Sequence, residues 1–164
     1  MPKARRRRTQ RAGVTVTEST FLPAILKSMQ EISKYEVHVG AAADQSGSQE
    51  IAMIAGVHEF GSVKRGIPAR SFIRTGKNKA RAAAGKVARA GVNAVVQKNE
   101  SVHGLFTKLG EIALQRTLKN FDAIRTPPIS ARYSKRRKNG KLLVQEQKLR
   151  DSLSYRITKR GTDQ

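Results

Sequence analysis

Residues 51–74 read IAMIAGVHEFGSVKRGIPARSFIR, and this stretch decides how the chain is organised. Its first seven residues, 51–57, are mostly apolar and are typical of a short buried helix. From Phe60 to Thr75 the chain contains Gly61, Gly66 and Pro68, which favour a loop. Pro68 has a fixed φ and keeps the preceding residue extended, so the backbone has few choices at this point.

Two long helices are predicted after this loop. The first spans residues 77–98 and the second runs from residue 102 to about residue 120, where apolar side chains recur at helical spacing. The first of these helices has a narrow seam of small side chains, which allows close approach of another element. That element can belong to the same chain or to a neighbouring subunit. The seam consists of Ala80, Ala84, Val87, Ala88, Gly91 and Val95.

Shorter elements are predicted on either side of these helices. Residues 14–17 alternate as a strand does, and Ser19 or Thr20 can then cap a helix that carries Pro23 in its first turn. Residues 35–40 return to the period of a strand, and a polar loop follows at 44–48. The chain ends with one or two helical turns over 147–153 and a strand over 153–157. The apolar face of the first helix consists of Leu22, Ile25, Leu26, Met29 and Ile32.

These elements predict an α+β fold in which a small β-sheet is packed by two longer helices. The length of the chain, 164 residues, suggests one domain with extensions. We expect a basic flexible arm over 1–13, a single domain over 14–158 and a short tail over 159–164. Within the domain, residues 130–141 are expected to form a long basic loop.

Charge is the strongest functional signal. The chain has 33 Lys and Arg against 12 Asp and Glu, and its formal net charge is +21. Self-repulsion of this size opposes compactness, so we expect a polyanion or neighbouring subunits to compensate it. No apolar run approaches the roughly 18 residues of a membrane span. The chain has no cysteine, which excludes disulfides and thiolate metal sites.

The cations concentrate in two segments, the arm and the predicted basic loop. Such segments bind phosphate groups without reading sequence, and their binding falls steeply with salt. Solvated tails that keep the protein soluble are the alternative, and the arm can also be a mitochondrial or nuclear address signal. The candidate contacts with nucleic acid or with a subunit are Lys3, Arg5, Arg6, Arg7, Arg8, Arg11, Arg132, Lys135, Arg136, Arg137 and Lys138.

Signatures of catalysis are incomplete. His58-Glu59 begins like a zinc-protease helix, but Ser62 stands where the second histidine is needed. Gly61 and Gly66 have the spacing of a phosphate-binding loop, yet Ile67 and Pro68 follow instead of Lys and Ser or Thr. The twelve acids are scattered singly, whereas a two-metal nuclease needs clustered carboxylates. We therefore expect no enzyme activity, no cofactor and no metal.

The run from Ile51 to Ser62, followed by Gly66-Ile67-Pro68-Ala69-Arg70-Ser71-Phe72-Ile73-Arg74, resembles the tail-completion or neck proteins of long-tailed bacteriophages. These are also called virion-morphogenesis or minor tail proteins. Thr126 to Ser130 and Leu149 to Ile157 are similar to later elements of that family. The resemblance covers most of residues 19–158. Ser71 replaces the family's usual proline, which should loosen the loop, and Glu146-Gln147 replaces its Thr-Gly.

The resemblance implies a structural virion protein that forms a homo-oligomeric ring, sixfold, around the DNA channel at the head–tail junction. Its partners would be head-connector and tail-tube or tail-terminator proteins, with the DNA backbone, and no membrane. It would lie in the neck or tail of the virion, and in the host cytoplasm during assembly. The structural loop would comprise Glu59, Phe60, Gly61, Ile67, Pro68, Ala69, Arg70 and Phe72.

Within this loop, we expect Phe60 and Phe72 to clamp the turn into the core. Glu59 and Arg70 should lie near one another, either paired or as two independent surface charges. Two competitors remain for the function. A free-standing protein that binds the phosphate backbone of nucleic acid, for example on the ribosome, would be a monomer or dimer. A nuclease or other enzyme would show metal-dependent cleavage.

Overall fold

The computed structural model describes residues 5–11, 14–41, 49–128 and 147–161. It confirms the α+β class: long helices pack against a two-stranded sheet. The contacts divide the chain into two compact units. The first unit comprises Met1–Val37, Gly85–Leu109 and Ile157–Gln164, and the second comprises His38–Ala84 and Gly110–Arg156.

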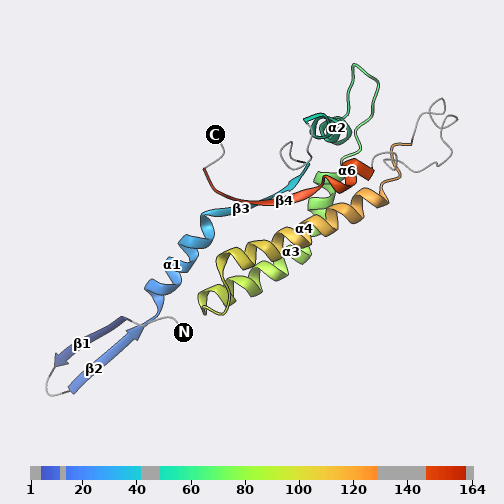
Figure 1. Cartoon of the computed structure of the whole chain (residues 1–164). Helices are drawn as coiled ribbons and strands as arrows, with labels where there is room; N and C mark the ends of the chain where they lie inside the picture. Colours follow the sequence, from blue (N-terminus) through green and yellow to red (C-terminus); the bar gives the residue numbers. More distant parts are fainter. Residues whose placement is uncertain (1–4, 12–13, 42–48, 129–146, 162–164) are drawn as a thin grey trace. The chain divides into compact units, whose positions relative to one another are not determined.

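Two long helices contribute to both units. Helix α3 spans Phe72–Val96 and helix α4 spans Val102–Ala123. They lie side by side (Figure 1) and touch through glycines in each unit. In the second unit, a Cβ added at Gly76 would lie 2.8 Å from Thr117 Cα, and in the first unit a Cβ at Gly91 would overlap Leu105. At Gly91, the seam of small residues is therefore occupied by the chain's own α4.

The sheet consists of β3 (Tyr35–Gly40) and β4 (Ser154–Lys159). In the first unit, the ring of Tyr35 lies 5.8 Å from the ring of Phe106 in α4. In the second unit, Tyr155 of β4 packs directly over Gly110 of α4, where any larger residue would collide with its ring. Aromatic side chains of both strands therefore pack on α4.

The second unit contains a compact core in which α2 (Gln49–Phe60) and α6 (Gln147–Asp151) join α3 and α4. The rings of Phe72 and Phe121 meet edge to face, 5.1 Å apart. Edge-to-face aromatic pairs add roughly 0.5–1.5 kcal/mol to the free energy of burial. The fully or nearly fully buried members of the core are Ala55, Phe72, Phe121, Leu149 and Leu153.

The N-terminal segment differs from the expected flexible arm. Residues Arg5–Arg11 form strand β1, which pairs antiparallel with β2 over Val14–Thr20, and Arg7 stands opposite Glu18. Pairing of two strands satisfies backbone N–H and C=O groups and needs no apolar residue. Strand β2 can therefore supply the hydrogen-bond partners that the arm alone lacks. Residues 1–4 and 12–13 lie outside the described residues, as do the expected polar loop at 44–48 and the basic loop at 130–141.

Other boundaries shift by a few residues. Helix α1 spans Leu22–Ser33, with Phe21 at its N-cap, where Ser19 or Thr20 was expected. The hydroxyl of Thr20 nevertheless accepts a hydrogen bond from the Leu22 N–H, at 3.3 Å. Helix α4 is capped by Ser101, whose Oγ accepts from the Gly104 N–H at 2.9 Å.

Candidate functional site

A buried carboxylate at the end of α2 holds the start of α3. Glu59 is 6% exposed and accepts three hydrogen bonds. Its donors are the Ile73 N–H at 2.8 Å, the Arg74 N–H at 2.9 Å and the Ser71 hydroxyl at 2.8 Å. The first N–H groups of a helix have no partner inside it, and a negative charge there is stabilised by the helix dipole. Glu59 thus acts as an N-terminal cap from a distant part of the sequence.

This cap explains why α3 begins at Phe72, five residues before the expected start at residue 77. Ser71 precedes the helix, and its hydroxyl donates to Glu59. This hydroxyl gives the loop a hydrogen bond that a proline at position 71 could not make.

Arg70 joins the loop before α3 to the segment that follows α4. Its guanidinium is buried, and it donates from Nε to the Pro127 carbonyl at 3.1 Å and from Nη2 to the Pro128 carbonyl at 3.3 Å. Its own N–H donates to the His58 carbonyl at 2.7 Å. Burial lowers the pKa of Arg70, although arginine remains protonated in proteins. Arg70 and Glu59 lie near one another but bind different partners, and both are buried, so both expected arrangements, an ion pair and two independent surface charges, were wrong.

Between Glu59 and Arg70 the chain forms a tight turn. The Ser62 N–H donates to the Ile67 carbonyl at 2.8 Å, and the Ile67 N–H returns a bond of 2.9 Å to the Ser62 carbonyl. Gly61 has a φ of +79°, and a Cβ there would lie 2.8 Å from the Ala69 nitrogen. Glycine is needed at this position for both reasons.

The expected aromatic clamp holds on one side only. Phe72 is completely buried, whereas Phe60 is 82% exposed and was wrongly assigned to the core. Val63 is fully exposed at the turn. The buried face of α2 carries Ala55 and Glu59, which are four residues apart. Phe60, the last residue of the helix, follows Glu59 directly and therefore lies on a different face.

Asn120 is a structural residue to which no sequence pattern points. It is buried on α4 and donates from Nδ2 to the Phe72 carbonyl at 2.8 Å and to Thr75 Oγ1 at 2.6 Å. Its Oδ1 accepts from Lys79 Nζ at 2.6 Å. In the sequence, Asn120 is only a polar residue beside the apolar face of a helix. Many exposed asparagines occur in the same position, so this pattern does not single it out.

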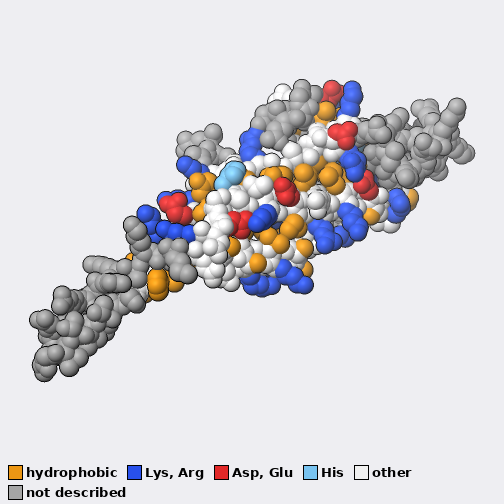
Figure 2. Space-filling view, turned by 60° about the horizontal axis from the view of Figure 1, so that its bottom comes forward, with side chains coloured by type: hydrophobic (Ala, Val, Ile, Leu, Met, Phe, Trp, Pro, Cys, Tyr) orange, Lys and Arg blue, Asp and Glu red, His pale blue; other side chains and the backbone are white. Residues whose placement is uncertain are grey.

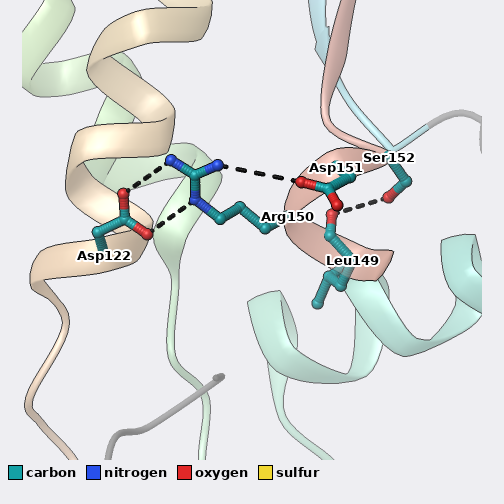
Figure 3. A network of polar contacts seen from close by, with 5 residues as sticks. All are labelled: Asp122, Leu149, Arg150, Asp151 and Ser152. Carbon is teal, nitrogen blue, oxygen red and sulfur yellow. Dashed lines mark hydrogen bonds and ion pairs between the residues drawn. The ribbon is translucent and has the colours of Figure 1, made fainter. Parts of the chain in front are cut away.

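A second polar tie attaches α6 to α4. Arg150 donates from Nε and Nη2 to the two oxygens of Asp122, at 3.0 and 3.1 Å, and its Nη1 lies 4.0 Å from Asp151 (Figure 3). The hydrogen bond and the charge of Asp122 raise the pKa of Arg150. Next to it, Ser152 Oγ donates to the Leu149 carbonyl at 2.8 Å.

The predicted basic contacts are placed only in part. Arg5, Arg6, Arg7, Arg8 and Arg11 belong to strand β1. Lys3, Arg132, Lys135, Arg136, Arg137 and Lys138 lie outside the described residues. Figure 2 shows more Lys and Arg side chains than Asp and Glu side chains on the face of the described chain that it presents.

Helix α1 leaves most of its predicted apolar face exposed, with Ile32 half-buried. None of its residues is buried, and Leu22, Leu26 and Met29 are exposed by 58%, 54% and 46%. Ile25 is 36% exposed and Phe21, just before the helix, 47%. Positions 22, 25, 26 and 29 share one side of a helix, so these side chains form a continuous strip. We call this strip the α1 apolar face.

The described residues contain no group of three or more His, Cys, Asp or Glu that could hold a metal ion. Among the same residues, no helix combines the length and the hydropathy that a membrane crossing requires. Comparison of the chain with protein-family models, with curated proteins and with solved structures finds no match.

Proposed function

We propose that the chain is a structural protein of the phage neck or tail, which completes the tail and joins it to the head connector as a homo-oligomeric ring, sixfold, around the DNA channel. The observation that carries this proposal is the α1 apolar face. Monomeric soluble proteins rarely expose large continuous apolar patches, and such a patch usually marks an interface.

The residues that carry the family resemblance support a structural role. Glu59 caps α3, Arg70 fixes the exit of α4, and Gly61 permits the turn between them. Each of these groups is used in holding backbone segments together. A motif whose polar groups are consumed by the fold suits an assembly component that must present a rigid surface.

A closed ring requires a heterologous interface, in which two different surfaces of the same chain meet. The α1 apolar face supplies one apolar surface in the first unit. The second unit exposes Met53 (58%), Phe60 and Val63. The chain thus carries uncovered apolar side chains on two separate elements, as a head-to-tail contact needs.

The excess of positive charge supports the location around DNA. A net charge of +21 is compensated when the phosphates of a nucleic acid pass through the ring. The basic residues of β1 and those of residues 130–141 are the proposed contacts with DNA or with a neighbouring subunit. Phosphate contacts position a protein without sequence readout, which fits a channel that must accept any DNA sequence.

The ring is tested by the mass of the full-length protein in solution and by images of the purified particle. The double substitution Leu26→Gln with Met29→Gln removes apolar area from the α1 apolar face and should shift rings to smaller species. A matched control changes Lys27 and Glu31 to Gln on the other side of α1, without changing the net charge. Rings that persist in the first variant contradict the role of α1, and a particle without the protein at its neck contradicts the location.

The alternative is a free-standing protein that binds phosphate backbones. It explains the positive charge as the proposed function does, but it does not require a ring interface between subunits. It predicts a monomer or dimer at low and at high salt after nuclease treatment, whereas the proposed function predicts rings under both conditions. Deletion of residues 1–13 should lower DNA affinity and flatten its dependence on salt. Unchanged binding after this deletion rejects the role of the arm.

A further inference from the structure

Helix α3 has an unusual charge composition. It carries six Lys or Arg side chains and no Asp or Glu. Helix α4, which lies beside it, mixes three Lys or Arg with Glu111 and Asp122. Like charges three and four positions apart destabilise a helix by a few tenths of a kcal/mol, roughly as much as opposite charges stabilise it. The composition of α3 therefore works against its own stability.

Three of these cations form a row in the second unit. Arg74, Lys77 and Arg81 are exposed and are spaced by three and four residues, which places them on one side of α3. At the rise of an α-helix, the row extends over about 10 Å. We call these three residues the α3 cationic row.

The row has no ionic partner among the residues that the structure describes. Among the described residues, no carboxylate lies within 4.0 Å of the side-chain nitrogens of Arg74, Lys77 or Arg81, and these side chains make no hydrogen bond. Other cations of the same unit are engaged. Lys79 binds Asn120, and Arg150 binds Asp122.

The surroundings of the row distinguish between kinds of anionic partner. The other exposed side chains of α3 in this unit are Asn78, Lys79 and Ala82, and none is a large apolar residue. Protein interfaces have an apolar core rich in aromatic residues and methionine, whereas surfaces that bind DNA are polar and strongly positive. The α3 cationic row has the second character, and the α1 apolar face has the first.

We propose that the α3 cationic row binds the phosphodiester backbone of duplex DNA. Phosphates of one strand follow each other at about 3.4 Å along the helix axis, so a row of about 10 Å can reach three of them. The assignment rests on the proposed DNA channel and deepens it. It puts a DNA contact on a helix of the folded body, in addition to the two basic segments.

The test uses the full-length protein and a fluorescent duplex of random sequence, with binding measured between about 50 and about 200 mM salt. Lys77→Gln with Arg81→Gln should make the slope of log affinity against log salt shallower by about 2, since each lost phosphate contact removes about 1. The matched control is Lys64→Gln with Arg65→Gln, which removes the same two residue types from the exposed turn. Its slope should stay within about 0.5 of that of the parent protein, a small part of the change of about 1 that one lost contact produces.

A charge-conserving variant, Lys77→Arg with Arg81→Lys, should bind as the parent does. Circular dichroism checks the fold of each variant, and Gln has nearly the helix propensity of Lys and Arg. An unchanged slope in the Lys77→Gln, Arg81→Gln variant overturns DNA binding by the α3 cationic row but leaves the proposed function intact. Absence of DNA binding by the parent protein overturns the DNA channel itself. Equal competition by poly-glutamate at matched charge overturns the assignment to phosphate.

Discussion

The turn from Glu59 to Ser71 and the helix α1 place their polar and apolar groups in opposite ways. In the turn, a buried carboxylate and a buried guanidinium are consumed by backbone groups of the same chain. In α1, four large apolar residues are partly exposed, by 36% to 58%. The first region is complete in one chain, whereas the second leaves apolar area exposed, which we propose a neighbouring subunit covers. Stability of the chain and assembly of the chain should therefore respond to different substitutions.

The largest expected effect is at Glu59. Replacing it with alanine leaves the N–H groups of Ile73 and Arg74 and the Ser71 hydroxyl without an acceptor, and hydrogen bonds to a charged group contribute about 1.5–3 kcal/mol. We expect the free energy of unfolding to fall by about 3 kcal/mol. Urea unfolding of the purified protein measures the change.

The control for that substitution is Glu59→Gln, which retains one acceptor oxygen. It should lose roughly half as much stability, because the amide can serve only part of the three donors. Equal losses for the two variants would show that burial of the side chain, and not its acceptor oxygens, stabilises the start of α3.

The second effect compares two glycines of the same turn. Gly61→Ala meets the Ala69 nitrogen at 2.8 Å and also requires a positive φ, so we expect a loss of about 2–3 kcal/mol. Gly66→Ala requires a positive φ of 61° but meets nothing within 4 Å, so about 1 kcal/mol is expected. Thermal unfolding of the pair measures both. If the two losses are equal, the close approach at Gly61 does not matter.

A smaller effect is expected for the tie between α6 and α4. Asp122→Asn removes the charge that Arg150 contacts through two nitrogens, but Asp122 is 52% exposed. Exposed ion pairs contribute about 0.2–1 kcal/mol, so we expect a loss in that range that shrinks as salt is added. Unfolding at low and high salt checks it, and a loss above 2 kcal/mol contradicts a surface role.

The smallest effect on stability is expected in α1. Leu26→Gln with Met29→Gln should change the unfolding free energy of the dissociated chain by at most about 0.5 kcal/mol, because both residues lie on the surface and about half of each is already exposed. The same variant should impair assembly. Unfolding at protein concentrations below those at which rings form separates the two readouts. A large loss of stability in the dissociated chain would mean that α1 packs within its own chain.

The positions and types of most helices were predictable from the chain's periodicity. Apolar spacing places α1 and α4 well, because an amphipathic pattern repeats over several turns. Gly61 and Pro68 mark the turn that the structure contains. Local residue chemistry is enough for these features, since the helix period and the permitted φ values depend on near neighbours.

The sequence by itself also determined that this chain is strongly cationic and carries an apolar strip on α1. Only the tertiary structure decided that α3 begins at Phe72, that Phe60 points into solvent, and that Arg70 binds the carbonyls of Pro127 and Pro128. The physical reason is distance along the chain. Glu59 lies fourteen residues from Ile73 and Arg70 lies 57 from Pro127, and no local pattern records which buried polar groups will meet.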